Sequence, residues 1–74
     1  LNQEFLATLR QRFPELTTYD SRLCLYLRIG LSSREIADIL NVLPSSVNVS
    51  RSRLRKKLGL DSGEDLQKFL VSMV

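Results

Sequence analysis

The side chains best suited to binding a charged ligand lie together between Val47 and Gly59. This stretch, VNVSRSRLRKKLG, contains five of the 11 basic residues of the chain and no carboxylate. The five are Arg51, Arg53, Arg55, Lys56 and Lys57. Guanidinium and ammonium groups bind phosphates through charge and hydrogen bonds, so this segment predicts a polyanionic partner, of which nucleic acid is the commonest.

The excess positive charge of the chain is confined to this region. The formal charge of all 74 residues is +3. Residues 1–43 and 61–74 together contain six basic and eight acidic side chains, whereas residues 44–60 contain five basic ones and none that is acidic. One basic segment in an otherwise neutral to slightly acidic chain is typical of a domain that contacts a polyanion with one face.

Residues that could perform catalysis or bind a metal are scarce. The chain has no histidine, which removes the usual general base and every Cys/His metal cluster. It also lacks a glycine-rich phosphate loop, and its carboxylates are scattered along amphipathic segments, as expected of solvated faces and helix caps. We therefore predict no enzymatic activity, no metal and no cofactor.

Length and hydropathy predict one soluble domain. A chain of 74 residues can enclose only one modest core. No apolar run approaches the roughly 20 residues that a membrane span needs, so we expect no membrane contact by this domain. A lone cysteine, Cys24, and the absence of a signal pattern favour the cytoplasm. The start at Leu1 instead of Met predicts a module from a larger regulator, whose other parts could be membrane-bound.

Apolar spacing and end signals predict the first two helices of an all-α fold with four to five short helices. Residues 2–12 carry an apolar stripe that Pro14 ends. Residues 18–29 carry a second stripe, which begins after the capping pair Thr17 and Asp20. The residues predicted to face inward are Phe5, Leu6, Leu9, Phe13, Leu23, Cys24 and Leu27.

A helix-turn-helix is predicted in the middle of the chain. Ser32 and Glu35 form an S-x-x-E capping box that starts a helix ending at Leu40. Only residues 41–43 separate it from the next helix, which starts near Pro44. Two helices joined by so short a turn cross steeply, which is the geometry of a helix-turn-helix.

A last helix is predicted within residues 61–74, with Asp61 or Ser62 as its N-cap. Its apolar stripe comprises Leu66, Phe69, Leu70 and Met73. Such a stripe completes the core or, in part, serves a dimer contact.

The basic helix separates into two faces when its residues are placed 100° apart. Val47, Leu54 and Leu58 fall within about 20° of one line and define a buried edge. The opposite face is centred on Val49 and Lys56 and includes the short neutral side chains of Ser45, Asn48 and Ser52. Arg55 stands on one flank of this face, and Arg53 and Lys57 stand on the other. This arrangement fits a major groove, where the centre of a helix reads base edges and flanking cations reach phosphates. The predicted base-reading residues are Asn48, which could pair with adenine, Val49 and Ser52.

Arg51 lies between the two faces, about 40° from the buried edge. It could lay its aliphatic stem on the core and pair with Asp20 or Glu35, or it could contact a phosphate. Both roles remain open from the sequence.

Residues 16–60 resemble the LuxR/GerE-type helix-turn-helix that ends many bacterial response regulators. The resemblance is carried by GLSSREIADIL in the first helix of the motif, SSVNV at the start of the second and RKKLGL at its end. The whole chain is further similar to the C-terminal domains of large signalling regulators of Bacteroidetes. Residues 1–14 would then be an extra N-terminal helix and residues 61–74 a C-terminal helix. Leu43 departs from the usual hydroxyl or acidic cap of the family.

This resemblance implies sequence-specific binding of double-stranded DNA by a homodimer, as the output domain of a transcriptional regulator in two-component signalling. The last helix would supply the dimer contact. The base-contacting positions of the family fall on Asn48, Val49 and Ser52. Its phosphate-contacting positions fall on Ser45, Ser46, Arg51, Arg53, Arg55, Lys56 and Lys57.

Two alternatives differ in their partners. Region four of a sigma factor also ends in an arginine-rich DNA-binding helix and would add RNA polymerase as a second partner. A protein-interaction or dimerisation module would use the apolar stripes as functional surfaces and leave the basic helix merely solvated. DNA binding that weakens steeply with salt would separate the LuxR/GerE-type domain and the sigma-factor region, which both bind DNA, from the protein-interaction module.

Overall fold

A computed structural model of the chain describes residues 2–73, which form five helices. These are α1 (Asn2–Arg12), α2 (Thr18–Arg28), α3 (Ser33–Leu40), α4 (Pro44–Lys57) and α5 (Leu66–Val71). No strand occurs between residues 2 and 73, so the predicted all-α class is confirmed. None of the helices in this range is long and apolar enough to cross a membrane.

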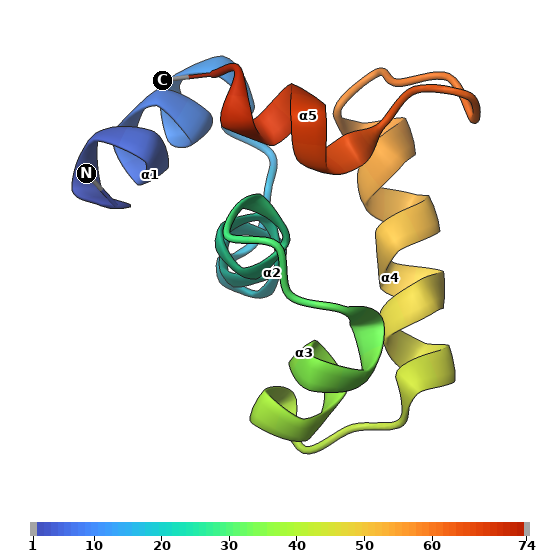
Figure 1. The fold of residues 1–74 in the computed structure, drawn as a ribbon. Coiled ribbons are helices and arrows are strands. Elements are labelled where there is room, and N and C mark those ends of the chain that lie inside the picture. Colours follow the sequence, from blue (N-terminus) through green and yellow to red (C-terminus); the bar gives the residue numbers. More distant parts are fainter. Residues whose placement is uncertain (1, 74) are drawn as a thin grey trace.

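The helices are arranged around α2, which Figure 1 shows nearly end-on, with α1 and α5 above it, α3 below it and α4 along one side. Helix α3 packs on α4, and α2 packs on α1, α4 and α5. All five helices contribute to one core, so no helix is a separate unit. The core residues are Phe5, Leu9, Leu23, Cys24, Leu27, Ile36, Ala37, Val47, Leu54, Leu58, Leu66 and Leu70.

The two predicted capping boxes are confirmed, and they set where α2 and α3 begin. Thr17 Oγ1 accepts a hydrogen bond from the Asp20 amide at 3.0 Å, and the Asp20 carboxylate accepts one from the Thr17 amide at 3.0 Å. Ser32 and Glu35 form the same reciprocal pair at 3.1 and 2.9 Å. Each box satisfies two backbone N–H groups that the first turn of a helix leaves without partners.

The turn from α3 to α4 is made by a left-handed residue and a proline. Asn41 has φ 58° and ψ 48°, the left-handed conformation that asparagine adopts more readily than most residues. Leu43 is extended, with φ −78° and ψ 147°, and makes no side-chain cap, while Pro44 is the first residue of α4. Pro44 has no N–H to leave unsatisfied, so α4 starts without a side-chain cap, as the sequence predicted.

The prediction for the start of the last helix is wrong. Helix α5 begins at Leu66, and its cap is Asp65, whose Oδ1 accepts a hydrogen bond from the Lys68 amide at 3.0 Å. Asp61 and Glu64 instead form a turn, in which the Asp61 amide donates to Glu64 Oε1 at 3.2 Å. The chain uses this turn to change direction after α4 and lay α5 on α2, so the first carboxylate after α4 caps no helix.

The apolar stripe of α5 is largely used inside the monomer. Leu66 is 1% exposed and Leu70 is 0% exposed, so these two side chains leave no surface for a second subunit. Phe69 and Met73 are half-buried against the core. The Phe69 ring meets Phe13 edge-on, with 6.2 Å between the ring centroids, which ties α5 to the end of α1. The predicted dimer contact is therefore corrected for Leu66 and Leu70.

Cys24 is a core residue, as predicted. It is 0% exposed, and burial, with a smaller effect of the nearby Asp20 carboxylate, raises the pKa of its thiol to about 12. A thiol with this pKa stays protonated near neutral pH and is a poor nucleophile.

Candidate nucleic-acid interface

Helix α4 rests on the core along the edge predicted from its periodicity. Val47 and Leu54 are 0% exposed and Leu58 is 6% exposed. The residues of α4 that are exposed on the other side include Ser45, Ser46, Asn48, Val49, Ser52, Arg53 and Lys56. All three predicted base-reading residues therefore lie on the solvent side of the helix.

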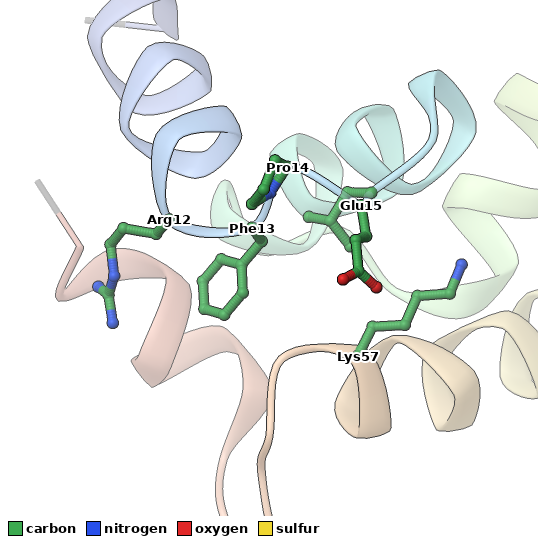
Figure 2. Close-up of a pocket in the computed structure, with 6 residues that line it drawn as sticks. Arg12, Phe13, Pro14, Glu15 and Lys57 are labelled. Carbon is green, nitrogen blue, oxygen red and sulfur yellow. The ribbon is translucent and has the colours of Figure 1, made fainter.

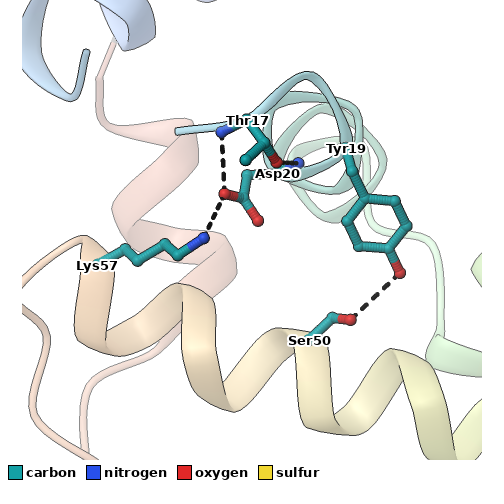
Figure 3. Close-up of polar contacts among 5 residues, drawn as sticks. All are labelled: Thr17, Tyr19, Asp20, Ser50 and Lys57. Carbon is teal, nitrogen blue, oxygen red and sulfur yellow. Dashed lines mark hydrogen bonds and ion pairs between the residues drawn. The ribbon is translucent and has the colours of Figure 1, made fainter. Parts of the chain in front are cut away.

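Helix α2 holds α4 at two polar contacts, which Figure 3 shows. Lys57 Nζ lies 2.6 Å from Asp20 Oδ2, and the hydroxyls of Tyr19 and Ser50 are hydrogen-bonded at 3.2 Å. The same Asp20 oxygen also accepts the bond from the Thr17 amide, so one carboxylate caps α2 and anchors the end of α4. These contacts set the position of α4 relative to the rest of the domain.

The ion pair gives Lys57 a role inside the domain that the sequence did not predict. Its side chain is 43% exposed, and its ammonium group is turned toward α2. Lys57 was predicted to contact a phosphate. In this structure such a contact requires it to leave Asp20 or to share its three N–H donors between the carboxylate and a phosphate.

The Asp20 carboxylate is stabilised in its charged form. Burial by itself raises its pKa, but the hydrogen bonds from Lys57 and from Thr17 outweigh this effect and lower the pKa below the ordinary value of 3.8. The folded domain therefore releases this proton more readily than the unfolded chain. This contribution to stability is fully present above about pH 4 and is lost as the pH falls through the folded-state pKa.

Replacing Asp20 is expected to make the domain less stable in a pH-dependent way. Asp20→Asn should lower the free energy of unfolding at pH 6, because the ion pair with Lys57 is lost. The expected loss is only about 1 kcal/mol, since water already solvates part of the Lys57 side chain and weakens the pair. The difference from the unmodified domain should shrink toward pH 3. Urea denaturation of both proteins at several pH values measures it. The lowered pKa of Glu35 affects the stability of both proteins alike, so it cancels in the comparison. A difference in unfolding free energy that stays constant from pH 6 to pH 3 would contradict the stabilising role of the charged Asp20.

Arg51 does not pair with either predicted carboxylate. Asp20 is occupied by Lys57, and the Glu35 carboxylate is occupied by the Ser32 amide. Arg51 is half-buried and instead donates from Nη1 to Ser33 Oγ at 2.9 Å, at the first residue of α3. The structure thus gives Arg51 a role in joining α3 and α4, with a hydroxyl as its partner where the sequence predicted a carboxylate.

The remaining cations of α4 differ in how they are engaged. Arg55 is half-buried, and its guanidinium donates to the backbone carbonyl of Glu64 in the turn before α5. Within residues 2–73, the side chains of Arg53 and Lys56 are exposed and make no hydrogen bond or ion pair. These two cations are the ones already available to an external anion.

Asn48 is also engaged by α3. Its Oδ1 accepts a hydrogen bond from Ser33 Oγ at 2.8 Å, and its side chain is exposed at the edge of α4 that faces α3. Ser33 therefore contacts both Arg51 and Asn48, which lie one turn apart on α4.

Comparison with known families assigns most of the chain to a family. Residues 16–70 match the GerE family, described as bacterial regulatory proteins, luxR family. The match covers well over half of the chain and includes α2, α3, α4 and nearly all of α5. The chain belongs to the luxR family. Searches of curated proteins and of solved structures give no significant match.

Membership of the luxR family makes α3 and α4 the helix-turn-helix of a DNA-binding regulatory domain. The family is regulatory and not enzymatic in character. No group of His, Cys, Asp or Glu residues in the described part of this luxR-family domain could hold a metal ion. The match also favours this family over region four of a sigma factor.

Two shallow hollows flank the C-terminal end of α4 in this luxR-family domain. One, of about 200 Å³, is lined by Ser52, Arg55, Lys56, Leu60 and Ser62 and is next to the predicted contact residues. The other, of about 160 Å³, is lined by Arg12, Phe13, Pro14, Glu15, Leu16 and Lys57. Figure 2 shows that Lys57 contributes its aliphatic chain to this hollow while its ammonium points away from Phe13. This hollow thus lies between the end of α1, the segment that joins α1 to α2, and the end of α4.

Sequence reasoning missed two residues that position α4 in this luxR-family domain. Tyr19 and Ser33 hold Ser50, Asn48 and Arg51 of α4 by hydrogen bonds. Their signals in the sequence are those of ordinary first-turn residues of α2 and α3. Only the folded arrangement brings them to α4.

Proposed function

We propose that this luxR-family domain binds double-stranded DNA in a sequence-specific manner, as the output domain of a bacterial transcription regulator. The observation that carries the proposal is the outer face of α4, where short neutral side chains lie beside unpaired cations. Because the bacterial chromosome lies in the cytoplasm, the proposed site of action is cytoplasmic. Signalling through a two-component system belongs to the same proposal and rests on the family resemblance alone.

The proposed phosphate contacts fall into two groups. Arg53 and Lys56 need no rearrangement, because they are exposed and unpaired within residues 2–73. Ser45 and Ser46 are exposed at the start of α4, where their hydroxyls could bond a phosphate. Contacts by the other predicted cations, Arg51, Arg55 and Lys57, require them to share or exchange their present partners.

The proposed base contacts lie between these phosphate contacts. Val49 is 50% exposed, which suits apolar contact with a thymine methyl. Ser52 is also exposed, and it lies one turn before Lys56 on the same face of α4. Asn48 completes the set at the edge facing α3. Short side chains at these positions let the helix approach base edges closely.

A homodimer is part of the proposal, with its contact on the part of α5 that the core leaves uncovered. Val71 is 48% exposed, and Phe69 and Met73 are half-buried. This is a smaller surface than the four-residue stripe predicted from the sequence. Sedimentation of the domain alone, and of the domain bound to a duplex with two half-sites, tests whether a homodimer forms. Val71→Glu should weaken this dimer without unfolding the monomer.

Salt dependence tests the proposed DNA binding directly. Each neutralised phosphate contributes about −0.9 to the slope of log affinity against log salt concentration. With between two and five cations of α4 engaged, raising salt from about 50 to about 200 mM should weaken binding by between about tenfold and about five-hundredfold per domain. Fluorescence anisotropy with a labelled random duplex measures this. No binding at the lower concentration, or binding insensitive to salt, would favour an interaction module without DNA.

A further inference from the structure

Ser33, at the first position of α3, connects two residues of α4 by hydrogen bonds. Arg51 Nη1 donates to Ser33 Oγ at 2.9 Å, and Ser33 Oγ donates to Asn48 Oδ1 at 2.8 Å. Ser33 and Arg51 are half-buried, whereas Asn48 is exposed. The two hydrogen bonds therefore connect Arg51, at the inner edge of α4, through Ser33 of α3 to Asn48 on the proposed DNA face.

The chemistry of the three groups sets the direction of each hydrogen bond. A guanidinium has only donors, so Ser33 Oγ must accept from Arg51. This leaves the single hydroxyl hydrogen of Ser33 for Asn48, where the carbonyl oxygen Oδ1 accepts it. The oxygen of the Asn48 amide is thereby held toward α3. Within residues 2–73 the amide nitrogen Nδ2 makes no hydrogen bond, so its two N–H donors remain to be used.

This orientation changes what Asn48 can recognise. The bidentate pairing of asparagine with adenine needs both amide atoms at the base edge, because Oδ1 accepts from N6 and Nδ2 donates to N7. With its oxygen turned toward Ser33 of α3, Asn48 is left to present the N–H donors of Nδ2 to a base edge. Guanine presents two acceptors in the major groove, O6 and N7, and thymine presents O4. An amide that offers donors matches these edges and leaves the N6 donor of adenine without a partner.

We propose that Ser33, held by Arg51, is a specificity-determining positioning residue that directs Asn48 to read an acceptor edge, guanine or thymine, in place of adenine. This inference rests on the proposed DNA binding and deepens it. It also replaces the pairing with adenine that the sequence suggested for Asn48.

Selection of duplexes from a random pool tests the assignment. The unmodified domain is compared with Asn48→Ala, Ser33→Ala and Ser33→Thr. The base position at which Asn48→Ala loses preference identifies the contact. There the unmodified domain should prefer guanine or thymine. Ser33→Ala frees Oδ1 and should raise the affinity for adenine relative to the preferred base about tenfold or more, measured on duplexes that differ only at that position. Ser33→Thr keeps the hydroxyl and should keep the original preference.

The outcomes separate this inference from the proposed function. A preference for adenine by the unmodified domain at the base position that Asn48→Ala identifies overturns the inference without any change at Ser33. An unchanged preference in Ser33→Ala, checked for native helix content by circular dichroism, also overturns it while DNA binding stands. Failure of the unmodified domain to bind any duplex rejects the proposed function and, with it, this assignment.

Discussion

Reversal of two charges on α4, Arg53→Glu together with Lys56→Glu, is expected to weaken duplex binding by about two orders of magnitude. Both side chains are exposed and have no internal partner within residues 2–73, so their charge is directed at an external anion. The loss should be similar on specific and random sequence, because phosphate contacts carry no sequence information. The salt slope should become shallower by about two, one for each lost phosphate contact.

A matched control separates the position of these charges from their number. Arg10→Glu with Lys68→Glu makes the same change in net charge on exposed residues of α1 and α5. Figure 1 shows α1 on the opposite side of the domain from α4, and α5 runs from the end of α4 back toward α1. Binding by this control should fall only slightly. If it falls as far as in the α4 variant, the domain responds to net charge and α4 is not its DNA-binding face.

Truncation of Leu54 to alanine is expected to cost about 2–5 kcal/mol of stability. Leu54 is 0% exposed and lies in the middle of the buried edge of α4, so its removal leaves a cavity where α4 meets the core. For a domain of 74 residues this is a large part of the total free energy of unfolding. Urea denaturation followed by circular dichroism measures the change, and DNA binding should fall in proportion to the unfolded fraction.

Leu43→Ala is the control for this truncation, because it removes the same atoms just before the same helix. Leu43 is 70% exposed and makes no cap, so the change should stay within about 0.5 kcal/mol. Equal losses at the two positions would mean that α4 is not held by the edge that contains Leu54.

The ends of α2, α3 and α4 could be predicted from the sequence because their signals are local. A capping box needs only residues three apart, and both boxes form as predicted. Asn41 and Pro44 act through their own backbone preferences, which do not depend on distant contacts. The last helix was misplaced because Asp61 and Asp65 both suit an N-cap, and the turn that selects Asp65 depends on where α5 must pack.

The choice of partner for each cation could not be predicted in the same way. Lys57 pairs with a carboxylate 37 positions away, and Arg51 bonds a hydroxyl 18 positions away. Arg51 and Lys57 both lie on the flanks of the same helix, and their charge alone does not distinguish an internal partner from a phosphate. The sequence therefore identified the basic segment but overestimated how much of its charge is unpaired.

The amino-acid sequence by itself determined the first four helices, the buried edge of α4 and the outer face of α4 with its cations, because helix periodicity and capping act over a few residues. Only the tertiary structure decided that Leu66 and Leu70 belong to the core, that Asp20 binds Lys57, and that Ser33 holds the oxygen of Asn48. An apolar stripe predicts that one face of a helix will be covered, and a charged side chain predicts that its charge will be solvated or paired. What covers or pairs them depends on how distant segments meet in space.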